Sequence, residues 1–238
     1  MNDIIIEDVS LNVLDGTSMA AFVARPKDSD KHPGIFIFQE AFGVNAHIRD
    51  VTKRFAREGF IAIAPELFHR TAHGFEGDYN DFNSTRVHIQ ALTNAGLIAD
   101  INAINDWMHN NTKLLYDEVA SIGFCMGGRV SFLANTAVKL KAAVSFYGGG
   151  MTAILDRAPA IQAPQLMFWG GLDQHIDEAQ INSVTSALKA NDKVYTNVIF
   201  SNAGHAFFCD ARSSYNPIAA KQSWALVLEF FNSYINKK

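Results

Sequence analysis

Three residues that could carry out nucleophilic catalysis stand in turn-like stretches of the sequence. Cys125 lies in GFCMGG, Asp173 in WGGLDQH and His205 in SNAGHAFF. A thiolate can attack a carbonyl carbon, and a histidine oriented by a carboxylate can accept the proton of the thiol. The order nucleophile, acid, histidine is typical of folds in which the nucleophile occupies a tight turn between a strand and a helix. The sequence therefore predicts a Cys–His–Asp triad.

The surroundings of Cys125 favour this interpretation. Gly123 and Gly127 stand two residues to either side, where glycine lets neighbouring backbones pass without a Cβ clash. A thiol at the start of a helix also feels the positive end of the helix dipole. The backbone N–H groups of Met126 and of Ala41, in the loop after an earlier strand, are predicted to form an oxyanion hole. Singly, an inert cysteine, a helix-capping aspartate or a loop histidine would be ordinary. Together at strand ends they favour catalysis.

The elements that must position these residues alternate between strand and helix. Segments 4–13 and 19–25, separated by Asp15-Gly16, predict an opening antiparallel hairpin. Further strands are predicted at 32–40, 60–66, 119–125, 142–148, 165–170 and 195–200, and helices at 47–58, 85–109, 126–138, 177–190 and 216–235. Such alternation predicts one α/β domain over 1–238, with a mostly parallel sheet of about eight strands between layers of helices. Catalytic residues of such sheets gather at the C-terminal ends of the strands.

Composition narrows the class of protein. The chain is 48% apolar and 18% charged, and its net charge of −4 comes from interspersed acidic and basic residues. It has no basic block, no basic leader and no apolar run near the roughly 18 residues of a membrane span, so neither nucleic acid nor a membrane is predicted as a partner. Cys125 and Cys209 are the only cysteines, which favours a reducing, cytoplasmic location. We expect a monomer or a weak homodimer.

Six stretches of the sequence resemble the dienelactone hydrolase (carboxymethylenebutenolidase-like) family of the α/β-hydrolase fold. They are FQEAFGV at 38–44, IAPELFHR at 63–70, GFCMGGR at 123–129, FYGG at 146–149, GGLDQHI at 170–176 and AGHAFF at 203–208. The resemblance implies a triad of Cys125, Asp173 and His205 that acts through a thioester acyl-enzyme on a small ester or lactone. It implies neither a metal nor an organic cofactor.

The resemblance also implies a role for Glu40. In this family the matching glutamate is thought to hold the resting thiol by a hydrogen bond and to release it when substrate enters. From the residues alone, a carboxylate beside a thiolate would oppose ionisation of the thiol, which fits a switch that keeps the sulfur neutral. A structural acid that bonds neighbouring amides is the alternative.

Two arginines are candidates for binding the substrate. The best-known substrate of the family is a lactone with a carboxylate, bound by arginines that include one shortly after the catalytic histidine. Here Phe208 and Cys209 occupy that stretch, which leaves Arg212 and Arg86 as candidates. For both, a solvated surface position is the alternative.

Aromatic residues beside strand ends could line an apolar pocket; these are Phe42, Tyr147 and Trp169.

The resulting hypothesis is a hydrolase of activated esters or lactones, because a thiolate nucleophile suits good leaving groups such as enolates. Two alternatives stay open. One is a general esterase or thioesterase of the same fold. The other is a non-catalytic binding module in which Cys125 is an oxidation-prone thiol.

Overall fold

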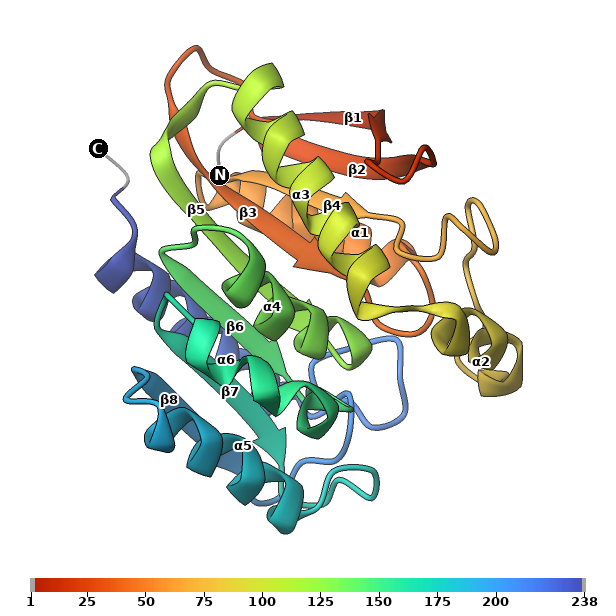
Figure 1. Cartoon of the computed structure of the whole chain (residues 1–238), viewed down its shortest axis with the longest axis vertical. Helices are drawn as coiled ribbons and strands as arrows, with labels where there is room; N and C mark the ends of the chain where they lie inside the picture. Colours follow the sequence, from red (N-terminus) through yellow and green to blue (C-terminus); the bar gives the residue numbers. More distant parts are fainter. Residues whose placement is uncertain (1–2, 237–238) are drawn as a thin grey trace.

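The chain folds around a mixed eight-stranded sheet with helices on both faces (Figure 1). The computed structural model describes residues 3–236, apart from the side chain of Tyr116. The strands are β1 (Ile4–Asn12), β2 (Ser18–Pro26), β3 (His32–Phe38), β4 (Ile61–Pro65), β5 (Leu114–Phe124), β6 (Ala142–Phe146), β7 (Gln165–Gly170) and β8 (Tyr195–Phe200). The helices are α1 (Ala46–Arg57), α2 (Phe82–Ala91), α3 (Asn94–Asn111), α4 (Met126–Ala137), α5 (Glu178–Ala190) and α6 (Pro217–Tyr234), with a 3₁₀ segment η1 (Met151–Ala160).

The strand order is β1-β2-β4-β3-β5-β6-β7-β8. β2 is antiparallel to both of its neighbours, β1 and β4, and the pairs from β4 to β8 are all parallel. The predicted α/β-hydrolase fold with a mostly parallel sheet is therefore confirmed. Because parallel strands share one C-terminal edge, the loops after β3, β5, β7 and β8 meet there.

The opening hairpin follows from its turn residues. Gly16 adopts a φ of 85°, a left-handed conformation that glycine reaches without strain. The Asp15 carboxylate accepts hydrogen bonds from the backbone N–H and the hydroxyl of Thr17, at 3.0 and 2.6 Å. The predicted pairing of β1 with β2 is confirmed.

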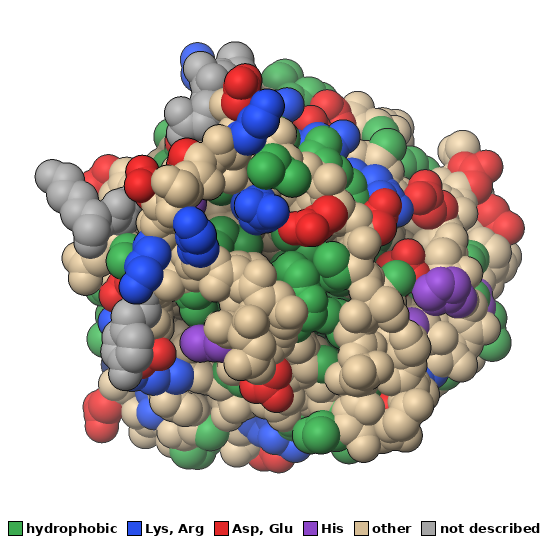
Figure 2. Space-filling view, turned by 90° about the horizontal axis from the view of Figure 1, so that it is seen from above, with side chains coloured by type: hydrophobic (Ala, Val, Ile, Leu, Met, Phe, Trp, Pro, Cys, Tyr) green, Lys and Arg blue, Asp and Glu red, His purple; other side chains and the backbone are tan. Residues whose placement is uncertain are grey.

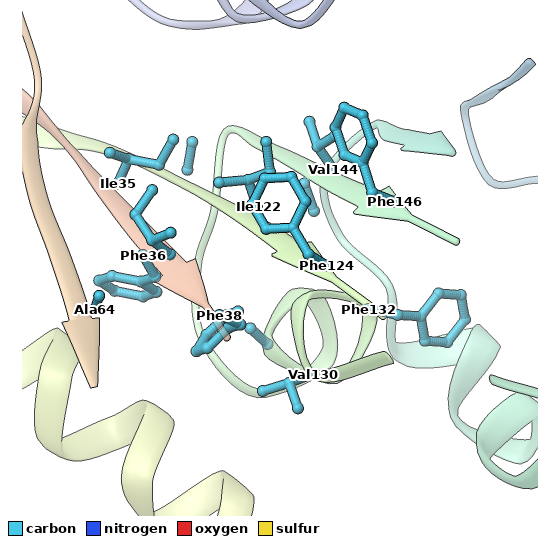
Figure 3. Close-up of a cluster of buried hydrophobic side chains, with 14 of the residues drawn as sticks. Ile35, Phe36, Phe38, Ala64, Ile122, Phe124, Val130, Phe132, Val144 and Phe146 are labelled. Carbon is cyan, nitrogen blue, oxygen red and sulfur yellow. The ribbon is translucent and has the colours of Figure 1, made fainter. Parts of the chain in front are cut away.

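The central strands are apolar along their whole length because both faces of the sheet are covered. Helices α1 and α6 pack on one face, and α3, α4, η1 and α5 lie on the other (Figure 1). The close-up in Figure 3 shows Phe38 of β3 on the side of the sheet that faces Val130 of α4, and Phe124 of β5 and Phe146 of β6 on the opposite side. A densely packed platform of this kind holds the end of β5, and with it Cys125, in a fixed place.

Two segments differ from the sequence-based expectation. The helix predicted at 85–109 is two helices, because Thr93 leaves the helical conformation and its hydroxyl caps α3 by accepting from the Gly96 N–H at 3.0 Å. Helix α2 consequently stands away from the sheet (Figure 1). The 3₁₀ segment η1 was not predicted, since its short turns carry no extended hydrophobic period.

The surface agrees with the mixed charge pattern of the sequence. Figure 2 shows cationic and anionic side chains intermixed over the face seen from the side of the β1–β2 hairpin. Within residues 3–236, no helix is both long and apolar enough to cross a membrane.

Candidate active site

Cys125 sits on a strained turn between β5 and α4. Its backbone has φ 53° and ψ −118°, in the left-handed half of conformational space that non-glycine residues rarely enter. The Cys125 N–H donates to the carbonyl of Phe146 at 3.0 Å, which fixes the turn to β6. A Cβ at Gly123 would collide with the Gly127 carbonyl, and a Cβ at Gly127 would collide with the carbonyl of Phe38. The two glycines are therefore required by close backbone approach.

The structure brings the three predicted catalytic side chains into one chain of contacts. His205 Nε2 lies 3.2 Å from Cys125 Sγ, and His205 Nδ1 lies 2.7 Å from Asp173 Oδ2. The other carboxylate oxygen of Asp173 accepts the N–H groups of His175 and Ile176, at 2.8 and 3.2 Å. Helix α5 is capped by Asp177 instead, so Asp173 is free of that task.

Hydrogen bonds and charges within the triad shift the pKa values of His205 and Asp173. Burial alone would lower the pKa of His205, but the bonds to Asp173 and Cys125 outweigh burial and raise it to about 10. Burial would raise the pKa of Asp173, but the bond to His205 and two backbone N–H groups lower it overall. Both shifts favour an imidazolium held by a carboxylate.

The predicted oxyanion-hole donors belong to the first residue of α4, Met126, and to the loop after β3, which contains Ala41. Met126 is the first residue of α4, so its N–H has no acceptor within the helix. Ala41 is 1% exposed, and its N–H donates none of the hydrogen bonds found among the described residues. Two such amides can stabilise a negatively charged oxygen that forms between them.

The carboxyl group of Glu40 is buried without a hydrogen-bond partner among the described residues. The residue is 1% exposed, and neither carboxyl oxygen is paired. Burial raises its pKa, against the opposing influence of Arg212, His205 and Tyr147. The hydroxyl of Tyr147 is also buried, and it has no hydrogen-bond partner among the described residues. In this structure the sulfur contacts His205 and not Glu40.

Arg212 acts on Glu40 electrostatically and lies beside two aromatic rings. The Arg212 guanidinium lies 5.4 Å from the Phe42 ring centre and 5.7 Å from that of Tyr79. The Tyr79 hydroxyl is bonded to Asn45 Nδ2 at 2.9 Å and to Cys209 Sγ at 3.4 Å. Tyr79 was not singled out in the sequence, because its partners come from distant segments.

The other candidates occupy different positions. Tyr147 is fully buried, and its ring centre lies 5.1 Å from that of His205. Arg86 is exposed on α2 and is not brought into contact with the triad. Trp169 donates to Asn197 Oδ1 at 2.6 Å and lines a small cavity beside η1 and α5. Cys209 is buried, and burial raises its pKa to about 11.

Among residues 3–236, no group of three or more histidine, cysteine, aspartate or glutamate side chains is arranged to hold a metal ion.

Comparisons with known proteins place the chain in a family. Residues 19–235 match the model of the dienelactone hydrolase family. A protein of Escherichia coli strain K12 named "Putative carboxymethylenebutenolidase" is 36% identical, with 94% of this chain and 85% of that protein covered. A Synechocystis protein of the same name is 34% identical, with 90% and 92% covered.

Solved structures agree with this placement. A structure from Klebsiella pneumoniae titled "Putative Dienelactone Hydrolase" superposes with a TM-score of 0.90 at 32% identity, covering 98% of this chain and all of that one. The dienelactone hydrolase of Anabaena variabilis shares the fold, with a TM-score of 0.73 at 18% identity and coverage of 98% and 99%. The chain belongs to the dienelactone hydrolase family. It is accordingly a hydrolase of carboxylic esters or lactones.

Proposed function

We propose that the chain hydrolyses activated esters and lactones through Cys125, His205 and Asp173, with a thioester acyl-enzyme. The observation that carries this proposal is the unbroken line of contacts from Asp173 through His205 to the sulfur of Cys125, at 2.7 and 3.2 Å. The strained turn that presents Cys125 at the start of α4 gives further support, because such strain persists where it serves function.

The reaction runs in two halves. The Cys125 thiolate attacks the carbonyl carbon, and the resulting oxyanion is held by the N–H groups of Ala41 and Met126. The carbon–oxygen bond then breaks, the proton on His205 Nε2 passes to the departing oxygen, and a thioester remains. Neutral His205 next removes a proton from water, whose oxygen attacks the thioester. Collapse of this second intermediate releases the carboxylic acid product and restores the pair of thiolate and imidazolium.

Glu40 completes the proposal as a switch on the thiol. Burial raises its pKa, which favours the protonated carboxyl, and a protonated carboxyl can bond the sulfur in the resting enzyme. The contact between Cys125 and His205 described here corresponds to the released arrangement. Of the two candidate arginines, Arg212 is the better placed to bind an anionic substrate group, because it lies beside the Phe42 ring and acts electrostatically on Glu40.

A substrate panel tests the activity. We expect the protein to hydrolyse p-nitrophenyl acetate and five-membered enol lactones faster than ethyl esters or acyl-CoA thioesters, because a thiolate expels good leaving groups best. Rates are followed spectrophotometrically at equal enzyme concentration. A preference for acyl-CoA would replace lactone hydrolysis with a thioesterase function. No turnover of any member, with a thiol that still reacts, would leave the binding-module alternative.

Replacing Glu40 tests the switch. In Glu40→Leu we expect iodoacetamide to alkylate Cys125 about three- to tenfold faster in the absence of substrate, since no acid then competes with His205 for the sulfur; tenfold corresponds to one pKa unit. Glu118→Gln is the control, because Glu118 is buried near the opposite end of β5. An alkylation rate equal to that of the wild type would show that Glu40 is structural.

A further inference from the structure

Gln39 is a buried amide whose two ends are both in use. It follows β3 directly and is 1% exposed. Its Oε1 accepts the N–H of Leu67 at 3.1 Å, and its Nε2 donates to the carbonyl oxygen of Glu40 at 3.3 Å. Because a backbone N–H can only donate, the amide oxygen must face Leu67 and the amide nitrogen must face Glu40. The orientation of the side chain is therefore fixed by its partners.

The hydrogen bond to the Glu40 carbonyl affects the orientation of the peptide group between Glu40 and Ala41. The carbonyl of Glu40 and the N–H of Ala41 belong to one planar trans peptide group, in which the two point in opposite directions. Whatever holds the carbonyl therefore also aims the N–H. In the proposed mechanism that N–H is an oxyanion-hole donor, and none of the hydrogen bonds among the described residues uses it.

The same stretch of backbone lies against the start of α4. A Cβ at Gly127 would collide with the carbonyl of Phe38 and would come within 2.5 Å of that of Gln39. The residues just before Ala41 are thus packed beside the turn that carries Cys125 and Met126. A small rotation of the peptide between Glu40 and Ala41 would change the distance between its N–H and the reacting oxygen.

We propose that Gln39 is a positioning residue of the oxyanion hole, an inference that rests on the proposed function. Through Leu67 it anchors to the segment after β4, and through Glu40 it sets the orientation of the Ala41 N–H. A residue that merely linked the ends of β3 and β4 would need only the first of these bonds. The second bond falls on one of the two peptides whose N–H groups the mechanism uses.

The substitution Gln39→Glu isolates the second bond. The ionised carboxylate still accepts from the Leu67 N–H but presents an oxygen, in place of the donor, to the Glu40 carbonyl. A protonated carboxyl could keep the bond through its hydroxyl, so Gln39→Met, which has no donor, decides between the two forms. Loss of one oxyanion donor lowers kcat by about 10²- to 10³-fold, so a loosened donor is expected to lower kcat for p-nitrophenyl acetate by about ten- to a hundredfold. KM should change by less than about twofold, because the oxyanion exists only in the transition state.

Alkylation by iodoacetamide separates this role from an effect on the thiol. Displacement of iodide by the thiolate forms no oxyanion, so the alkylation rate of Cys125 should equal that of the wild type. Gln39→Met removes both bonds without adding a charge and should lose at least as much kcat. The matched control is Gln165→Glu, since buried Gln165 accepts from Asn135 Nδ2 at 3.2 Å and its own NH₂ group is unpaired among the described residues.

The outcomes are distinct. Wild-type kcat in a folded Gln39→Met, checked by circular dichroism and Tm, overturns the inference. Equal losses of alkylation and ester turnover overturn it as well, because Gln39 would then act on the thiol. A loss in Gln39→Glu but not in Gln39→Met would assign the effect to the added charge and not to the bond. If wild-type protein hydrolyses no ester, the proposed function itself fails, and that result is visible before any variant is made.

Discussion

Replacing Cys125 with alanine is expected to lower kcat for p-nitrophenyl acetate and enol lactones by at least about 10⁴-fold. Without the sulfur no thioester forms, and what remains is the rate enhancement from binding and the oxyanion hole alone. Among the described residues, the side chain of Cys125 makes one hydrogen bond, to His205, so its removal should leave the fold intact. Rates by stopped-flow and steady-state assay, with far-UV circular dichroism and Tm, check both expectations.

Cys209→Ala is the matched control for that experiment. Cys209 is fully buried, bonded to Tyr79, and has a raised pKa, so it should be a poor nucleophile. Iodoacetamide should therefore label Cys125 first and inactivate the enzyme in step with labelling, in wild type and in Cys209→Ala alike. Turnover that survives in Cys125→Ala, or labelling confined to Cys209, would remove Cys125 as the nucleophile.

Much of the fold could be predicted because its determinants are local. The hairpin follows from Asp15 and Gly16, and the buried strands follow from continuous apolar runs, which parallel strands covered on both faces require. The break between α2 and α3 was missed because Thr93 has ordinary helix neighbours, and only its cap on Gly96 reveals the new start. Local sequence does not distinguish a cap from a tolerated interior threonine.

The residues of the candidate site also fall into two groups, those that local sequence indicates and those that depend on packing between distant segments. Cys125, Asp173 and His205 could be placed because each stands in a glycine-containing turn after a strand. The partners of Tyr79, which are Asn45 and Cys209, come from separate loops and depend on packing. Arg86 and Trp169 were predicted from type and approximate place alone. The structure leaves the first exposed and directs the second toward η1 and α5.

Glu40 takes part in two steps of the proposed mechanism. Its side chain is proposed to govern the thiol, while its backbone carbonyl is held by Gln39 and its peptide presents the Ala41 N–H. Glu40 is thus proposed to influence both the ionisation of the Cys125 thiol and the stabilisation of the oxyanion. Substitutions at Glu40 and Gln39 are expected to separate the two, because alkylation reports the first and ester turnover reports both.

Replacing Asp173 with asparagine should be the second most damaging change. One carboxylate oxygen is already taken by the N–H groups of His175 and Ile176, which need an acceptor. The introduced amide would therefore keep its oxygen there and turn its NH₂ group toward His205 Nδ1. That nitrogen would have to become an acceptor, which moves the ring proton to Nε2 and leaves nothing to take the proton of the thiol. We expect kcat to fall by about 10³- to 10⁴-fold.

The pH dependence of Asp173→Asn distinguishes this tautomer effect from general damage. Loss of the carboxylate should lower the pKa of His205 from about 10, so the basic limb of kcat/KM should move to lower pH. Because that pKa is raised in the folded state, the pair stabilises the protein fully below about 6.5 and progressively less as pH rises toward 10. The Tm difference between wild type and variant should shrink across that interval. An unchanged basic limb would mean that Asp173 does not act through His205.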